Sequence, residues 1–135
     1  MNARKPEDCD RFLVAACERG EMEAILDLYE PGAVLHKLGS PGLATTREEI
    51  CEEFLPLLAL KPKFVIEQIV TSLHADGTLA TTRMRCTASG TDQEGNPMQT
   101  EFHTLEVVRK QADGSWKYAI DDPRGSARDQ GGIKL

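Results

Sequence analysis

The sequence lacks both long apolar runs and an excess of positive charge. No stretch approaches the roughly 18 to 20 apolar residues of a membrane-spanning helix, and no apolar signal-peptide segment follows the polar residues 1–5. Lys and Arg number 16 against 22 Asp and Glu, which gives a net charge of −6. Nucleic acids and anionic membranes are held by clustered positive charge. We therefore expect no nucleic-acid partner, no membrane partner and a cytoplasmic location.

Closely spaced metal ligands are also missing. The 4 cysteines form no Cys-x-x-Cys pair, and the 3 histidines (His36, His74 and His103) lie far apart in the chain. Zinc sites and redox dithiols depend on such spacing. We therefore expect no metal site, and reduced thiols at Cys9, Cys17, Cys51 and Cys86.

What is present is enough for one globular domain. The 135 residues are 40% hydrophobic and 28% charged, as in ordinary soluble proteins. A chain of this size buries roughly two-thirds of its unfolded surface in one core. We expect a single domain over residues 1–124, followed by a flexible, polar, glycine-rich tail over residues 125–135.

The first half of the chain has helical periodicity. Apolar residues recur at helical spacing in three segments, 9–17, 22–29 and 50–58. Gly20 is typical of a left-handed C-cap, and two overlapping capping boxes pair Thr45 with Glu48 and Thr46 with Glu49. A short strand is predicted over residues 33–38, between the second and third helices.

The second half alternates with the period of strands. Residues 63–74, 78–91, 98–110 and 115–122 predict four strands, joined by turns that contain Asp-Gly or Asn-Pro. The order ααβαββββ predicts an α+β fold, in which three N-terminal helices pack on one face of a cone-shaped, curved, antiparallel-rich sheet. The concave interior of such a sheet is a natural small-molecule pocket.

Three stretches carry a resemblance to a known family. Residues 28–34 (LYEPGAV), 45–50 (TTREEI) and 106–117 (EVVRKQADGSWK) with 120–123 (IDDP) resemble the cone-shaped fold shared by nuclear transport factor 2, ketosteroid isomerase and the SnoaL-like polyketide cyclases, also called NTF2-like or cystatin-like. The resemblance covers residues 6–124. It is specific for fold and weak for function, because this fold carries enzymes, binding proteins and assembly modules.

The resemblance implies a homodimer with one pocket per chain and no metal or organic cofactor. In isomerase members, a carboxylate base on the first strand moves a proton beside a ketone, while a tyrosine and a protonated acid donate hydrogen bonds to the oxyanion. In this sequence Lys37 occupies the position of that carboxylate, with His36 beside it, and no acid lies between Glu30 and Glu48. Glu106 lies where the subgroup often has an acid.

Glu106 is the first candidate catalytic residue. By alternation it shares a strand face with Phe102, Thr104 and Val108. If this face is concave, desolvation raises the pKa of Glu106 and suits it to acid–base chemistry. The alternative is an outward face, on which Glu106 pairs with Arg83 or Arg85.

The neighbouring strand indicates which face is buried. Met84 and Cys86 alternate with Arg83 and Arg85, and arginines rarely point into an apolar interior. We expect Arg83 and Arg85 on the outer face, where the homodimer forms. The alternative is that one arginine binds a carboxylate ligand.

Two further candidate catalytic residues are His36 and Tyr29. The imidazole of His36 titrates near neutrality and would replace the missing base, or else His36 only bonds the following loop. Tyr29, expected at the end of the second helix, would donate into the pocket mouth, or else packs its ring with the hydroxyl in water. The predicted ligand-binding residues are Lys37, Phe54, Met84, Cys86, Phe102, Thr104, Trp116, Tyr118 and Asp122.

Two functions fit these observations. In the first, a small, largely apolar organic molecule binds in the cone, with isomerase- or cyclase-type proton transfer on a ketone or enone. In the second, the domain is a non-catalytic binding or homodimerisation module. A carboxylate or imidazole buried beside the pocket favours the first function, and a purely apolar pocket the second.

Overall fold

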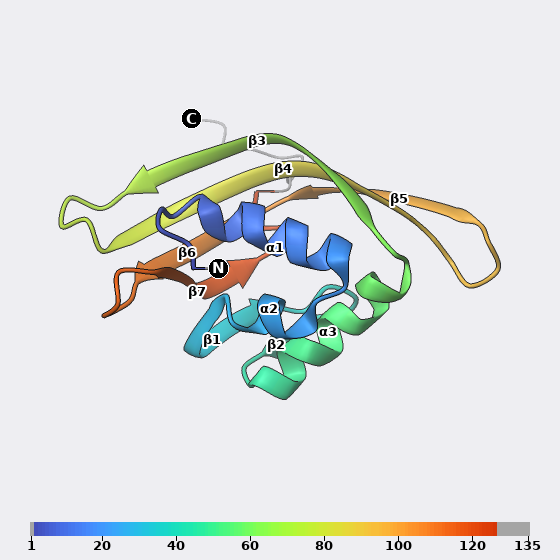
Figure 1. Ribbon diagram of the computed structural model, residues 1–135, viewed down its shortest axis with the longest axis horizontal. Helices are drawn as coiled ribbons and strands as arrows, with labels where there is room; N and C mark the ends of the chain where they lie inside the picture. Colours follow the sequence, from blue (N-terminus) through green and yellow to red (C-terminus); the bar gives the residue numbers. More distant parts are fainter. Residues whose placement is uncertain (1, 127–135) are drawn as a thin grey trace, which may run out of the picture.

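In the computed structural model, which describes residues 2–126, three helices lie on one side of a single curved sheet (Figure 1). The elements in chain order are α1 (Asp8–Arg19), α2 (Met22–Leu26), β1 (Tyr29–His36), β2 (Leu43–Ala44), α3 (Arg47–Ala59), β3 (Lys63–Leu73), β4 (Leu79–Thr91), β5 (Pro97–His103), β6 (Leu105–Lys110) and β7 (Trp116–Asp122). No helix within these residues is long and apolar enough to cross a membrane.

The sheet has 7 strands in the order β2-β1-β7-β6-β4-β3, and β5 pairs with β4 beyond the end of β6. Strands β1 and β7 are parallel, and the other pairs are antiparallel. The long strands β3 and β4 arch over α1 (Figure 1). The predicted α+β fold, with three N-terminal helices and a mostly antiparallel curved sheet, is confirmed.

Two of the three predicted helix signals form. Gly20 has φ 68° and donates its backbone N–H to the carbonyls of Ala16 and Cys17, which ends α1. Thr46 is the N-cap of α3, and its hydroxyl accepts a 3.1 Å hydrogen bond from the N–H of Glu49. The other predicted box does not pair as expected, because the backbone N–H of Thr45 bonds Glu49, not Glu48.

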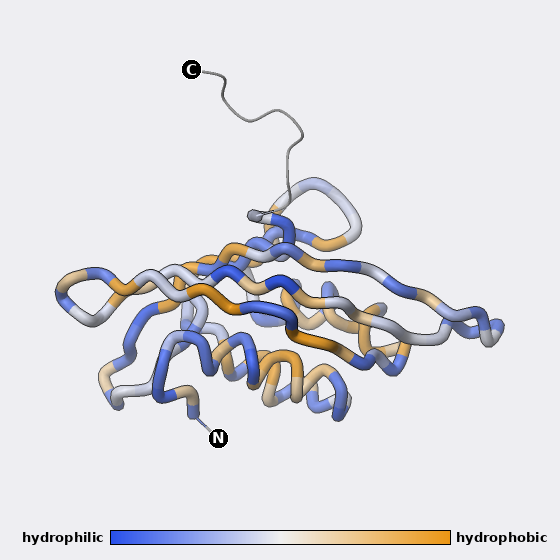
Figure 2. Tube along the Cα trace, turned by 90° about the horizontal axis from the view of Figure 1, so that it is seen from above, coloured by the Kyte–Doolittle hydropathy of each residue, from blue (hydrophilic) through white to orange (hydrophobic). Residues whose placement is uncertain are grey.

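The core lies between the helices and the concave face of the sheet (Figure 2). It contains Ile25 of α2, Leu35 of β1 and Val108 of β6, all fully buried. The end of α3 touches β4 so closely that a Cβ on Gly90 would lie 2.6 Å from the carbonyl oxygen of Leu60. Figure 2 also shows that the far tip of the β4–β5 hairpin is hydrophilic.

Tyr29 was predicted at the end of a helix, and the structure corrects this. The helix ends at Leu26, and Tyr29 begins β1 opposite Tyr118 of β7. The backbone N–H of Tyr118 donates a hydrogen bond to the carbonyl oxygen of Leu28. The backbone of this segment therefore finds its hydrogen-bond partner on a strand 90 residues away in sequence, and not within a helix. Gly32, with φ 82°, lies in the irregular part of β1, where the register with β7 shifts.

The predicted strand over residues 98–110 is two strands. Thr104 separates β5 from β6 and bonds Met84 twice: its N–H donates to the Met84 carbonyl (2.9 Å), and its hydroxyl accepts from the Met84 N–H (3.0 Å). The chain bends there, so that β6 also pairs with β7. The two-residue strand β2 was not predicted. Of the predicted flexible tail, residues 127–135 lie outside the described residues.

Candidate functional site

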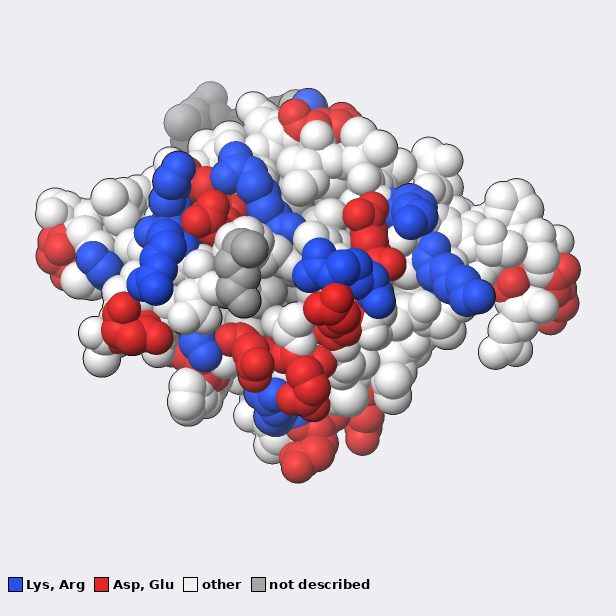
Figure 3. Space-filling model, viewed as in Figure 1, with Lys and Arg blue, Asp and Glu red and all other residues white. Residues whose placement is uncertain are grey.

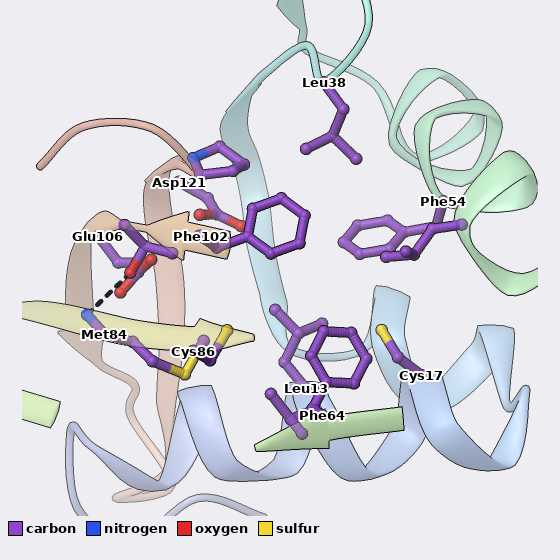
Figure 4. A pocket seen from close by; sticks show the side chains of 14 residues that line it. Leu13, Cys17, Leu38, Phe54, Phe64, Met84, Cys86, Phe102, Glu106 and Asp121 are labelled. Carbon is purple, nitrogen blue, oxygen red and sulfur yellow. Dashed lines mark hydrogen bonds between the residues drawn. The ribbon is translucent and has the colours of Figure 1, made fainter. Parts of the chain in front are cut away.

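A small cavity lies between α1, α3 and the strands β4 to β6 (Figure 4). Its volume is about 50 Å³. The walls are mostly apolar and include Leu13, Cys17, Phe54, Phe64, Met84 and Phe102. Leu38, from the loop after β1, and Pro123, just after β7, complete the lining. The cavity is therefore small and mostly apolar.

Two carboxyl groups interrupt this apolar lining. Glu106 of β6 and Asp121 of β7 are 2% and 3% exposed, and both line the cavity (Figure 4). The hydroxyl of Thr82 donates to Oε1 of Glu106 over 2.7 Å. The hydroxyl of Tyr29 donates to Oδ2 of Asp121 over 2.5 Å. Each carboxyl group is thus oriented by one hydroxyl donor.

A third carboxyl group, that of Asp10, lies behind the cavity wall. Asp10 is on α1 and is 0% exposed. Its Oδ1 accepts a 2.8 Å hydrogen bond from Tyr118, and its side chain lies within hydrogen-bonding reach of Glu106. Its Oδ2 has no hydrogen-bond partner among residues 2–126.

Burial shifts the titration of all three acids in the same direction. Desolvation is the main cause of the raised pKa of Asp10, Glu106 and Asp121. Repulsion by neighbouring acids raises the pKa of Glu106 and of Asp121 further. The pKa of Asp121 rises to about 7, and that of Glu106 lies well above its ordinary value. Acids with raised pKa values beside a cavity, as Glu106 and Asp121 are, are suited to proton transfer.

The cavity thiols are not nucleophiles at neutral pH. Burial raises the pKa of both Cys17 and Cys86 to about 12, and both are free. Since the thiolate is the reactive form, these residues act as small apolar wall groups.

Six of the predicted site residues line this cavity: Glu106, Phe54, Met84, Cys86, Phe102 and Thr104. The predicted strand face is also the buried one, with Met84 and Cys86 inward and Arg83 and Arg85 exposed. The alternative in which Glu106 faces outward and pairs with Arg83 or Arg85 is wrong, because Glu106 is buried on the opposite face.

Three aromatic residues lie behind the cavity. Tyr29 is buried and reaches the site through Asp121, so its hydroxyl is not in water. Tyr118 reaches it through Asp10, and its ring lies 5.0 Å from that of Tyr29. Trp116 belongs to the hydrophobic core and does not line this cavity.

His36, Lys37 and Asp122 lie elsewhere. They line a separate, polar hollow of about 450 Å³, formed by the loop after β1 and the chain after β7. The structure does not bring His36 or Asp122 to Glu106. The placement of these three residues in one pocket with Glu106 is corrected. His36 is exposed at the end of β1, Lys37 lies in the loop that follows, and Asp122 alternates with the buried Asp121.

Asp121, rather than Asp122, lines the cavity because of an irregularity in β7. Val107 pairs with Ile120 and Val108 with Tyr118, so Ala119 is an extra residue. A bulge of this kind reverses the inside–outside alternation. Asp121 therefore joins Tyr118 on the buried face, whereas strict alternation predicted Asp122.

Asp10 was not among the predicted site residues, although the sequence carries a signal for it. Asp10, Leu13, Val14 and Cys17 follow the i, i+3, i+4, i+7 spacing of one helix face. An acid on an apolar helix stripe predicts a buried, partnered carboxyl group.

Among residues 2–126, no charged side chain other than these three acids is buried. Arg47 of α3 pairs with Glu23 (2.8 Å) and Asp27 (3.0 Å), and Arg85 pairs with Glu67 (3.2 Å). On the face shown in Figure 3, acidic and basic side chains are interspersed. No group of three His, Cys, Asp or Glu side chains in the described part of the chain is arranged to hold a metal ion.

Comparison with known proteins identifies the family. Residues 10–119 match the family of SnoaL-like domains, and the chain belongs to this family, within the NTF2-like superfamily. No curated protein matches the sequence.

Solved structures with the same fold come from bacteria. A protein from Xanthomonas campestris, assigned as a calcium/calmodulin-dependent protein kinase II association domain, is 27% identical, with a TM-score of 0.74 over 90% of this chain and 86% of the other. A ketosteroid isomerase-like protein from Erwinia carotovora atroseptica is 21% identical, with a TM-score of 0.71 over 87% and 90%. An NTF2-like superfamily protein from Salmonella enterica is 12% identical, with a TM-score of 0.74 over 95% and 93%.

Proposed function

We propose that the protein binds a small, largely apolar ketone or enone in the cavity and moves a proton beside its carbonyl group. The observation that carries this proposal is the pair of buried carboxyl groups, Glu106 and Asp121, on an otherwise apolar cavity. Among proteins of similar structure is one named as ketosteroid isomerase-like, which fits the same class of chemistry.

The two carboxyl groups have different tasks in this reaction. Glu106 takes a proton from the carbon next to the carbonyl group, and the electrons of the broken C–H bond move onto the carbonyl oxygen. Asp121, which is protonated in part at neutral pH and is fixed by Tyr29, donates a hydrogen bond to that oxygen. Glu106 then returns the proton to the same or a conjugated carbon, so no cofactor is consumed.

The cavity volume limits the ligand. About 50 Å³ holds a few water molecules, whereas ligand pockets usually measure roughly 300 Å³ or more. A ligand is therefore a small ring, and it enters by displacing the half-buried ring of Phe102 and the loop that carries Leu38.

Deuterium exchange tests this proposal directly. The protein is incubated with 2-cyclopentenone in D₂O, and loss of the ring C–H signals is followed by proton NMR. We expect exchange above the buffer rate with wild type, loss of that excess with Glu106→Gln, and a reduction with Asp121→Asn. The matched control is Glu52→Gln, an exposed position on α3, which retains full exchange. An excess that survives in Glu106→Gln contradicts the proposal.

The second candidate function is non-catalytic binding. The small cavity and the presence of Lys37 where isomerase members carry a base favour it. A thermal shift caused by 2-cyclopentenone without deuterium exchange would support this function over catalysis, because a bound ligand stabilises the native state by mass action.

We also propose a homodimer that forms through the outer face of the sheet, opposite the helices. Val65, Val70 and Ile120 are 65%, 45% and 44% exposed, and the register places Val70 beside outward-facing Arg83. Exposed apolar side chains on an open sheet face favour association of two copies.

A further inference from the structure

We infer that Asp10 and Glu106 share a single proton, and that Asp10 is thereby the positioning residue that keeps Glu106 ready to exchange a proton with the cavity. Asp10 does not line the cavity and acts only through Glu106. The role assigned to Glu106 rests on the proposed function, whereas the shared proton does not.

The first argument is the absence of a compensating cation. Asp10 and Glu106 are 0% and 2% exposed and face each other from α1 and β6. Within residues 2–126, no ion pair joins either of them to Lys, Arg or His. Two adjacent, buried, uncompensated negative charges are prohibitively costly. A proton between them removes one of those charges.

The second argument counts hydrogen-bond donors. Tyr118 donates to Oδ1 of Asp10, and Thr82 donates to Oε1 of Glu106. Thr82 also lies near Asp10, and the hydroxyl of Thr104 lies near Glu106. Within residues 2–126, however, the hydroxyl of Thr82 bonds Glu106 and not Asp10. Oδ2 of Asp10 is buried without a donor in the described part of the chain. A proton on the facing carboxyl group supplies the missing donor.

Two hydroxyl groups hold this pair, one on each carboxyl group. Tyr118 stabilises the charge on Asp10, and Thr82 fixes the plane of the Glu106 carboxyl group. When Glu106 takes up a proton on its cavity side, the shared proton moves fully onto Asp10. When Glu106 releases that proton, the shared proton returns to its position between the two groups. The pair therefore gains and loses one proton in total, and its charge alternates between −1 and zero.

Other groups surround the pair and act on its titration. The helix α1 contributes Cys9 and Arg11, and β1 contributes Tyr29. The strands β4 and β7 contribute Thr82, Cys86, Tyr118 and Asp121, and Thr104 lies at the bend before β6. Of these groups only Arg11 carries a positive charge. It lowers the pKa of Asp10 through space, without a contact.

Titration of the Glu106 carboxyl carbon tests the shared proton in the ligand-free protein. The protein is labelled with ¹³C at glutamate side-chain carboxyl carbons, and Glu106 is assigned by its absence in Glu106→Gln. In Asp10→Asn the amide oxygen still accepts from Tyr118, and the NH₂ group donates to Glu106. We expect the pKa of Glu106 to fall by about one unit or more. The control Glu18→Gln removes one exposed charge from the same helix and leaves the titration unchanged.

A second variant keeps the test decisive if Asp10→Asn does not fold. Tyr118→Phe removes the donor to Asp10 and leaves all three carboxyl groups in place. We expect the first ionisation of the pair to move to higher pH, since the charged form loses a hydrogen bond. Identical Glu106 titration curves in wild type and in each folded variant would overturn the shared proton.

The positioning role has its own readout. In Asp10→Asn, the pH optimum of 2-cyclopentenone exchange moves to lower pH together with the Glu106 titration. A purely structural role would lower the rate at every pH without moving the optimum, and that result would overturn the positioning role. If wild type shows no exchange at all, the proposed function fails, while the carbon titration still decides whether the proton is shared.

Discussion

The hydroxyl of Tyr29 donates a 2.5 Å hydrogen bond to Oδ2 of Asp121, and this contact joins the first strand to the last strand beside the cavity. Both side chains are buried. The bond lowers the pKa of Asp121, against the larger opposite effect of burial. Tyr29 therefore limits how far the pKa of Asp121 rises above that of an ordinary aspartate.

Tyr29→Phe is expected to raise the pKa of Asp121 above about 7. The ring is retained, but the ionised carboxylate loses its donor. Carboxyl-carbon NMR of labelled aspartate follows the change, and the loss of unfolding free energy is about 1 kcal/mol. Leu43→Ala, at an exposed position of β2, is the control that leaves Asp121 unchanged. A lower pKa of Asp121 in Tyr29→Phe would be incompatible with the hydrogen bond.

Stability is expected to fall as pH rises through the range from about 4 to above 7. The folded pKa of Asp121 is raised from 3.8 to about 7, so the native state binds its proton more tightly than the unfolded chain. The stability that this provides is fully present below the unfolded pKa and is lost as pH rises through the folded pKa. Urea denaturation at a series of pH values measures the slope, which is on the order of 1 kcal/mol per pH unit.

Asp121→Asn is expected to remove the contribution of Asp121 to the change of unfolding free energy with pH. Asp92→Asn is the control with the opposite sign, because hydrogen bonds from its turn lower the pKa of Asp92. The stability that Asp92 provides is present above its unfolded pKa and is lost as pH falls. If Asp121→Asn leaves the slope between pH 4 and 7 as steep as in wild type, Asp121 is not a source of it.

Two phenylalanines of the cavity are expected to differ in their effect on stability. Phe54 is 5% exposed and belongs to the core, so Phe54→Ala costs about 3–5 kcal/mol of unfolding free energy. Phe102 is half-buried, so Phe102→Ala costs less and widens the cavity. Chemical denaturation measures the first effect. The widened cavity of Phe102→Ala is measured by thermal shift with 2-cyclohexenone, which we expect to be larger than in wild type. An unchanged thermal shift would argue against Phe102 as the barrier to ligand entry.

Val65→Lys is expected to convert the proposed homodimer into a monomer. The substitution places a charge on the outer face of the sheet, where burial in the proposed interface would make it costly. Sedimentation velocity measures the mass of the particle. Leu43→Lys, at another exposed apolar position, is the matched control and retains the dimer. Equal masses for wild type and Val65→Lys would refute the interface.

Local signals determined much of the fold. The stripe from Cys9 to Cys17, the Gly20 cap and the Thr46 cap predicted helices that the structure confirms. Alternation in β4 predicted which side chains face inward, and the same reasoning placed Glu106 beside Phe102 and Thr104. These predictions succeed because helical and extended periods, and the hydrogen bonds of caps, depend on residues close in sequence.

Only the tertiary structure decided the composition of the carboxyl cluster. Asp10, Glu106 and Asp121 come from the first helix and the last two strands, and no local pattern shows that they meet. Because of the bulge at Ala119, Asp121 and not Asp122 faces the cavity. Because β1 pairs with β7, Tyr29 lies in a strand and not at the end of a helix. The sequence by itself determined that three helical segments precede the sheet, which face of β4 is buried, and the family. The partners of each buried acid, and hence its pKa, were decided by long-range pairing, because desolvation and hydrogen bonding depend on what the whole fold packs around a group.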